Sequence, residues 1–105
     1  MLFMVIETFR DGDMVPTYAR LQERGRSLPA GLEYLGSWVE ANFARCFQLM
    51  RCDDATLFQR WALEWRGTGR TLEIVPVVPS AEPAQIVAGY LDDRGGSAGD
   101  RGDLE

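Results

Sequence analysis

Histidine and lysine are both missing from the 105-residue sequence, and all eleven basic residues are arginine. Without histidine there is no Ser-His-Asp triad and no histidine-ligated haem or zinc, and without lysine there is no Schiff-base catalysis. Arginine stays protonated, so it can clamp an anion but cannot serve as a proton shuttle. Any acid–base chemistry must therefore fall to carboxylates, tyrosines or cysteines.

Long apolar runs are also missing, although 46% of the residues are hydrophobic. Because no stretch of about eighteen apolar residues exists, we expect no transmembrane helix and no membrane partner. The chain starts directly with the apolar segment 2–6, without a basic region or a small-residue cleavage site. We therefore expect no secretory signal and a cytoplasmic location.

Positive charge is scarce, and the net charge of −5 is mostly carried by the C-terminal tail. Residues 80–105 contain six acids and two arginines, so the rest of the chain is nearly neutral. No basic patch of the kind that binds nucleic acid is present, and we expect no such partner.

Cysteine is limited to Cys46 and Cys52, six residues apart. On one extended strand these two residues would lie about 20 Å apart, which is far beyond disulfide reach. We expect free thiols in a reducing compartment. A metal site built on two cysteines would need two carboxylates as well, and we expect no metal and no cofactor.

What is present is a regular alternation of strand and helix signals over residues 1–80. Four segments read as strands and two as helices, in the order strand 2–10, helix to about 26, strand 32–41, strand 44–52, helix to about 66, and strand 71–78. The second helix carries the clearest apolar stripe, formed by Leu57, Phe58, Trp61, Ala62 and Trp65. The order predicts an α+β, ferredoxin-like β-α-β-β-α-β sandwich with an antiparallel sheet and two helices on one face.

The C-terminal extension, residues 81–105, differs in character from this domain. Residues 81–91 are compatible with a short helix, whereas the Gly/Asp/Arg-rich segment beyond about residue 92 is expected to be mobile. The last two residues, Leu104 and Glu105, resemble a tag remnant and are not expected to belong to the fold.

The first and third strands are apolar on both faces, which indicates burial on both sides of the sheet. On the first strand, Phe3 and Val5 point one way, and Met4 and Ile6 point the other. A chain of this size has little left to cover the second face, so the pattern predicts a homodimer with sheet packed against sheet. The alternative is a monomer in which residues 81–91 fold back over the sheet.

The segments "MLFMVIETFRDGD", "GLEYLGSWVEANFARCFQLMRCDD" and "EIVPVVPS" resemble a bacterial family of small proteins of unknown function. That family is similar to the dimeric α/β-barrel superfamily. The resemblance implies a ferredoxin-like fold, the strand order 4-1-3-2 and a homodimer. The superfamily includes cofactor-independent monooxygenases, muconolactone-isomerase-like enzymes and ligand-binding proteins, but the resemblance implies no particular activity. Its haem-handling branch commonly uses histidine, which this chain lacks.

Polar side chains in the middle of the predicted strands form a candidate ligand site. Its members are Glu7, Trp38, Glu40, Arg45, Cys46 and Gln48. Buried polar groups need partners within the protein or on a ligand. By alternation Tyr34, Trp38 and Glu40 share one face of their strand, as Cys46 and Gln48 do on theirs. The two sets join one site only if the hairpin register puts those faces on one side, and Arg45 then points away.

Each candidate also has a structural interpretation. Glu7 suits an ion pair with an arginine, the two cysteines suit packing, and the three tryptophans suit the core. Three hypotheses for function remain open. The chain is a small-molecule-binding protein that acts as a cofactor-independent monooxygenase or isomerase, a non-catalytic dimeric ligand-binding or accessory protein, or a structural dimer without a pocket. A polar-lined cavity on the sheet would favour the first two, and a solid core the third.

Overall fold

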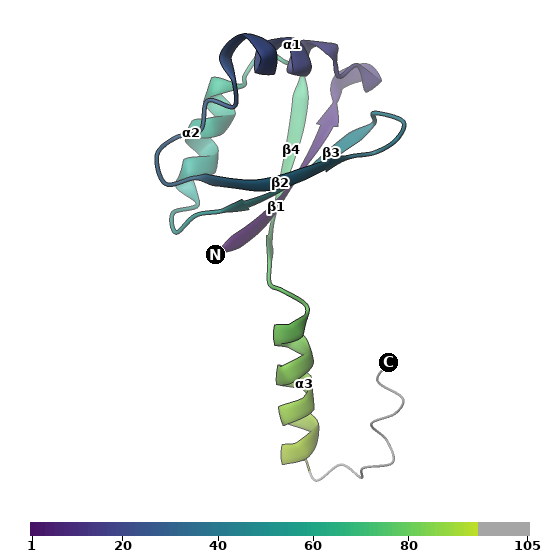
Figure 1. The fold of residues 1–105 in the computed structure, drawn as a ribbon, viewed down its shortest axis with the longest axis vertical. Coiled ribbons are helices and arrows are strands. Elements are labelled where there is room, and N and C mark those ends of the chain that lie inside the picture. The colour runs from purple at the N-terminus through teal and green to yellow at the C-terminus, as the bar shows by residue number, and fades with distance from the viewer. Residues whose placement is uncertain (95–105) are drawn as a thin grey trace.

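The computed structural model describes residues 1–94 and has an α+β architecture, with a four-stranded antiparallel sheet and three α-helices in that part of the chain (Figure 1). The elements are β1 (Leu2–Phe9), a short 3-10 helix η1 (Arg10–Gly12), α1 (Val15–Arg24), β2 (Glu33–Val39), β3 (Arg45–Arg51), α2 (Thr56–Glu64), β4 (Arg70–Val77) and α3 (Ala81–Asp93). The predicted order of strands and helices through residue 80 is confirmed. The expected mobile segment and tag remnant lie almost wholly outside the described residues.

The strands lie in the order β2-β3-β1-β4, and each neighbouring pair is antiparallel. Read from the other edge this is 4-1-3-2, the order that the resemblance implied. The two central strands, β1 and β3, are those whose sequences are apolar on both faces. This topology is compatible with a ferredoxin-like fold.

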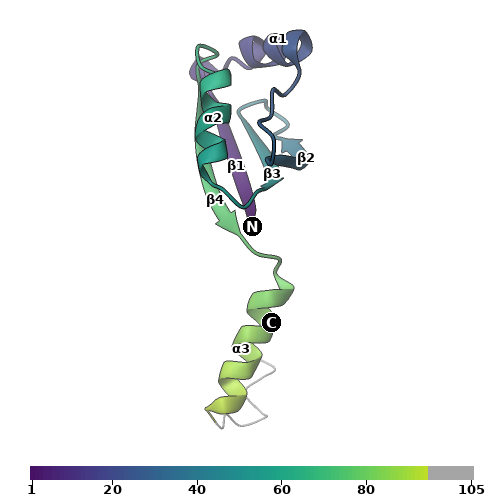
Figure 2. The same cartoon turned by 90° about the vertical axis from the view of Figure 1, so that its left-hand side faces the viewer.

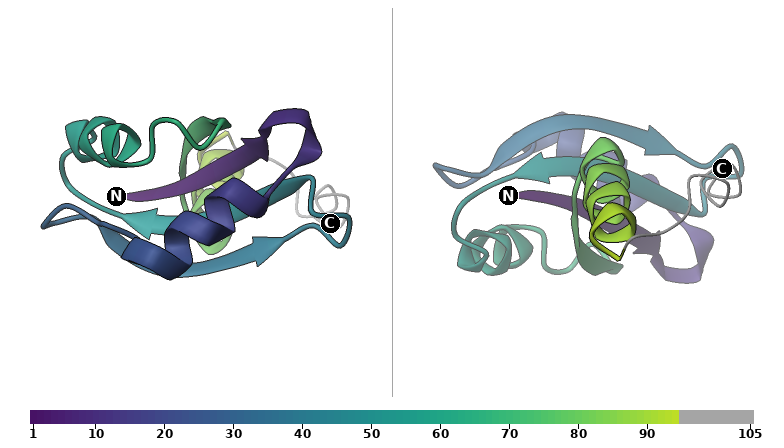
Figure 3. Two further views of the ribbon diagram at one scale, coloured as in Figure 1. Left: turned by 90° about the horizontal axis from the view of Figure 1, so that it is seen from above. Right: turned by 90° about the horizontal axis from the view of Figure 1, so that it is seen from below.

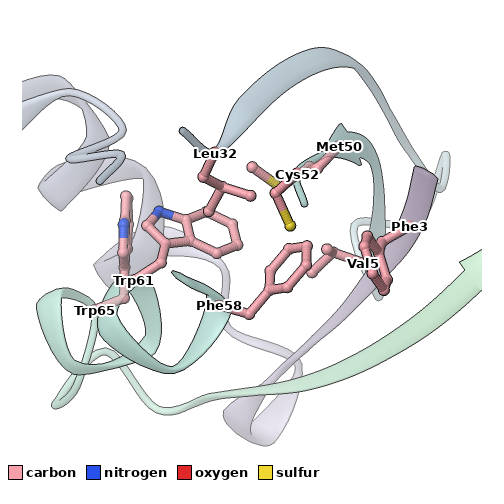
Figure 4. Packing of buried hydrophobic residues seen from close by; sticks show 8 residues of the cluster. All are labelled: Phe3, Val5, Leu32, Met50, Cys52, Phe58, Trp61 and Trp65. Atoms are coloured by element: carbon pink, nitrogen blue, oxygen red, sulfur yellow. The ribbon is translucent and has the colours of Figure 1, made fainter. Parts of the chain in front are cut away.

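The inner face of the sheet, which α1 and α2 cover, carries the hydrophobic core. Phe3 and Val5 of β1 are buried, and the Phe3 ring makes an edge-on contact with Phe58 of α2, with 5.0 Å between the ring centroids. Trp61, one turn further along α2, is 1% exposed. Figure 4 shows the cluster formed by Phe3, Val5, Leu32, Met50, Cys52, Phe58, Trp61 and Trp65. The predicted apolar stripe of α2 therefore faces the core, and its tryptophans are core residues.

A β-bulge in β2 changes which side chains share a face. Tyr34 pairs with Met50 on the inner face, but the register then shifts, and Gly36 pairs with Leu49 on the outer face. Trp38 consequently lies on the outer face, opposite to Tyr34. The expectation that Tyr34 and Trp38 share a face was wrong because one extra residue at a bulge reverses the alternation that follows it.

The outer face of the sheet is apolar at its centre and is not covered by either α1 or α2. Paired residues place the following side chains on it: Leu2, Met4, Ile6, Phe47, Leu49, Val75, Val77 and Trp38. Trp38 is 59% exposed. Two exposed ion pairs, Arg45–Glu40 and Arg51–Glu33, lie beside this apolar region.

Helix α3 projects from the end of β4 and stands apart from the sheet (Figures 1 and 2). Seen from below, it points almost directly at the viewer and does not lie across the strands (Figure 3). The alternative in which residues 81–91 fold back over the outer face is therefore wrong, and no helix among residues 1–94 covers that face. No helix among residues 1–94 combines the length and apolar character needed to cross a bilayer.

Candidate functional site

A cavity of about 120 Å³ lies between α1, α2 and the inner face of the sheet. It occupies the end of the sandwich away from the Phe3–Phe58 contact. The lining residues are Glu7, Phe9, Thr17, Tyr18, Leu21, Arg26, Ser37, Val39, Cys46, Gln48, Trp61, Trp65 and Arg70. A closed cavity of roughly 150 Å³ holds a benzene molecule. This one is slightly smaller but partly open to solvent, so it can take several waters, or a single small ring that lies partly in its mouth.

A buried ion pair forms the polar centre of the cavity. Glu7 is 3% exposed, and its Oε2 lies 2.8 Å from Nη1 of Arg70, whose side chain is equally buried. The side-chain amide of Gln48 donates a hydrogen bond to Oε1 of Glu7. The register explains this meeting, because Glu7 pairs with Leu72 on β4, and Arg70 is the next residue on the same face. The carboxylate thus has a cation and an amide donor in a site that excludes most solvent.

Arg70 lies against two indole rings, with its guanidinium carbon 4.9 Å from the ring centroid of Trp61 and 4.5 Å from that of Trp65. Burial lowers the pKa of Arg70, although the neighbouring Glu7 opposes this shift. The second terminal nitrogen, Nη2, is buried and has no hydrogen-bond partner among the described residues. Thr17 Oγ1, on the helix side of the cavity, is buried and unpartnered in the same part of the chain. Such atoms are uncommon in folded proteins and need an explanation.

Arg26 is held beside the cavity by the loop between α1 and β2. The indole N–H groups of Trp61 and Trp65 both donate to its carbonyl oxygen, each at 2.9 Å. Its guanidinium carbon lies 3.6 Å from the ring centroid of Tyr34, and its Nη1 is 3.5 Å from Oε1 of Gln48. No acidic side chain forms a salt bridge with Arg26 anywhere in residues 1–94.

Two ionisable groups of the cavity are held in their neutral forms. Burial, together with the nearby Glu7 carboxylate, raises the pKa of the Cys46 thiol to about 11, against the smaller opposing effect of two arginines. Burial also raises the pKa of Tyr18, and Cys46 and Glu7 add to that shift. At neutral pH both groups are therefore protonated, and neither supplies a thiolate or phenolate nucleophile.

The structure brings three of the six predicted site residues together and separates the other three from them. Glu7, Cys46 and Gln48 line the cavity. Arg45 is exposed on β3 and makes a two-point contact with Glu40, with distances of 2.7 and 3.0 Å. This contact lowers the pKa of Glu40. Trp38 lies on the outer face, opposite Phe47 of β3.

Sequence reasoning missed several cavity residues, most importantly Arg26, Arg70 and Thr17. Arg70 opens a strand that is otherwise mainly apolar, and that contrast is a signal for a buried cation. Arg26 lies in a loop without a regular period, so no pattern placed it beside the sheet. Thr17 faces inward from a helix whose first turns are mostly exposed, and its spacing alone does not distinguish it.

The fold and the cavity together define a small α+β protein with a pocket between helices and sheet, mainly apolar at its walls and with an ion pair at its centre. The chain belongs to the family described as Domain of unknown function (DUF3303), whose model matches residues 1–91. The match includes the sheet, both packing helices and most of α3. No curated protein and no solved structure matches the chain significantly.

Proposed function

We propose that the chain binds a small molecule in the cavity between α1, α2 and the sheet. The observation that carries this proposal is a cavity with apolar walls and a few converging polar groups, three of which have a buried atom without a hydrogen-bond partner. Ligand sites have this composition, with apolar surface for contact area and a few polar groups for orientation. The volume fits a small apolar or aromatic molecule. Glu7, Cys46 and Gln48 belong to this site, with Arg26 and Arg70 added to them.

The chemistry of the cavity supports binding more than catalysis. A nucleophile or general base works best when its pKa lies near the operating pH. The pKa of Cys46 is moved away from neutrality, and that of Tyr18 rises as well. The Glu7 carboxylate is already engaged by Arg70 and Gln48. The proposed function is therefore that of a non-catalytic ligand-binding protein, and the second candidate function is that of a cofactor-independent monooxygenase or isomerase.

We also propose that the protein is cytoplasmic. In addition, we propose that two copies associate through the outer faces of their sheets, as in the dimeric α/β-barrel superfamily. The support is the apolar outer face centred on Met4, Leu49 and Phe47, which neither α1 nor α2 covers. Contiguous exposed apolar patches of this kind mark protein interaction sites. The Arg45–Glu40 and Arg51–Glu33 pairs then lie beside the interface, where they can align the two copies.

Native mass spectrometry of the full chain, combined with a ligand-screen melt, tests both proposals. A dimer mass and a retained or stabilising small molecule are expected. The matched variants are Cys46→Met, which fills the cavity, and Cys46→Ala, which enlarges it. Cys46→Met should abolish ligand stabilisation while the protein stays folded, and Cys46→Ala should keep it. If no compound stabilises the wild type, or if Cys46→Met responds as the wild type does, the cavity is not the binding site.

A further inference from the structure

The cavity offers hydrogen-bond donors and an unbalanced positive charge. Glu7 and Arg70 neutralise each other, whereas Arg26 has no acidic partner in the described part of the chain. With the Cys46 thiol and the Tyr18 hydroxyl both neutral, the cavity as a whole carries one excess positive charge. A neutral ligand would leave this charge unmatched.

The ion pair also leaves a donor of Arg70 free, whereas the acceptor Oε2 of Glu7, which has no hydrogen bond, is held by its contact with the Arg70 cation. Glu7 directs one carboxylate oxygen to Gln48 and the other to Arg70, while Nη2 of Arg70 is buried without a partner. The guanidinium cannot lose its proton to relieve this, because arginine remains charged in proteins. The Arg70 side chain is 4% exposed, so bulk water does not satisfy the donor freely. Thr17 adds a hydroxyl that can donate from the helix side.

The Arg26 side chain is positioned to bind a ligand at the edge of the cavity, and it is not buried as a structural cation. Two indole N–H groups fix its backbone, and its side chain rests on the face of Tyr34 at the edge of the cavity. It keeps donors beyond the weak contact with Gln48. Charge-assisted hydrogen bonds from guanidinium groups to carboxylates are among the strongest that proteins form.

We propose that the ligand of this cavity is a small organic anion, a single carboxylate on a body no larger than one ring. This inference rests on the proposed ligand-binding function and names the ligand class. The carboxylate accepts hydrogen bonds from Nη2 of Arg70 and from Arg26. The ring lies against the apolar walls, which are formed by Phe9, Leu21, Trp61 and Trp65.

Three probes of the same shape and different charge test the ligand class: benzoate, benzamide and benzamidine. The readout is the set of indole N–H signals of the full chain labelled with ¹⁵N, since the protein has three tryptophans. The signals of Trp61 and Trp65 report on the cavity, and that of Trp38, on the outer face, is an internal control. We expect benzoate to shift both cavity signals and to bind about tenfold more tightly than benzamide. Benzamidine should leave them unshifted.

Variants of Arg26 separate the charge from the fold. Arg26→Gln should weaken benzoate binding about fivefold or more and leave benzamide binding nearly unchanged, because only the anion uses the charge. Arg26→Lys should retain most of the affinity for benzoate. Arg60→Gln, on the exposed side of α2, is the matched control and should behave as the wild type.

The possible outcomes distinguish this inference from the function on which it rests. If benzamide or benzamidine binds as tightly as benzoate, or if Arg26→Gln leaves benzoate binding unchanged, the anion assignment is wrong and the cavity remains a ligand site. If none of the three probes shifts the signals of Trp61 and Trp65, or if only Trp38 responds, both the inference and the proposed binding function are overturned.

Discussion

Removing Arg70 while keeping Glu7 would leave a carboxylate buried on the inner face of the sheet with only Gln48 as a partner. Both members of the ion pair are about 4% exposed, so solvent cannot replace the lost cation. Breaking a buried pair by removing one partner costs roughly 3–5 kcal/mol. Since small domains are stable by roughly 5–15 kcal/mol, Arg70→Met should lose at least about a fifth of the free energy of unfolding, and most of it if the domain lies at the low end of that range.

The double variant Glu7→Gln/Arg70→Met tests whether the unpaired charge is the cause. It removes both charges and keeps similar volumes, and such replacements are often close to neutral. We expect its free energy of unfolding to lie within about 2 kcal/mol of the wild type. Arg51→Met breaks the exposed pair with Glu33, whose side chains are 52% and 59% exposed, and serves as the control. The control should lose about 1 kcal/mol or less.

Urea unfolding followed by tryptophan fluorescence measures these differences, at one protein concentration because association shifts the midpoint. With a dependence of about 1–3 kcal/mol per molar urea, the Arg70→Met midpoint should fall by roughly 2 M. If this variant is unfolded in buffer, recovery of the fold in the double variant supports the same conclusion. If the double variant is as unstable as Arg70→Met, the packing of the arginine stem against the tryptophans matters, and the electrostatic reasoning is refuted.

Three further predictions address the outer face, the thiol and the turn before β4. Phe47→Asp should convert a dimer to a monomer in sedimentation, because it buries an unpaired charge at the interface, and a dimer mass for this variant would contradict the sheet-to-sheet arrangement. The folded-state pKa of Cys46, about 11, exceeds its ordinary value of 9.0, so its contribution to stability is complete below pH 9 and lost as the pH rises toward 11. Cys46→Ala should flatten that alkaline decline in urea midpoints, and an unchanged slope would contradict the shift. Gly69 has φ 79°, in the left-handed region that favours glycine. Gly69→Ala should therefore lower the stability of the protein by about 1–2 kcal/mol in thermal unfolding, whereas Gly89→Ala inside α3 should not lower it. Equal effects of the two substitutions would refute the backbone argument.

The regular parts of the fold followed from local patterns. The alternation in β1 placed Phe3, Val5 and Glu7 on one face, and all three are buried there. The i, i+3, i+4 spacing of the α2 stripe placed Phe58 and Trp61 in the core for the same reason, because side-chain direction in a regular element is fixed by its period. The topology needed the resemblance as well, since strand order is not visible in any single segment.

The candidate site was only partly predictable because two kinds of information are not local. The β-bulge between Tyr34 and Gly36 moves Trp38 to the outer face, and alternation alone cannot detect an extra residue in a strand. The partners of Glu7, Gln48 of β3 and Arg70 of β4, lie far from it along the chain. The sequence therefore indicated that a buried Glu7 needs a cation, but it did not indicate which arginine supplies it. A buried carboxylate in a sequence predicts an arginine somewhere, and only the register selects which one.

The bulge also determines which side chains of β2 face the cavity and which lie on the apolar outer face. With uninterrupted alternation from Tyr34, the ring of Trp38 would lie on the inner face, near the ion pair and in the space of the cavity. The shift instead leaves the small Ser37 on the inner face, opposite Gln48, and puts Trp38 beside Phe47 on the outer face. The inner face thereby keeps its cavity, and the outer face gains its largest apolar side chain. One inserted residue therefore supports both proposals at once, a binding cavity on one side of the sheet and an association surface on the other.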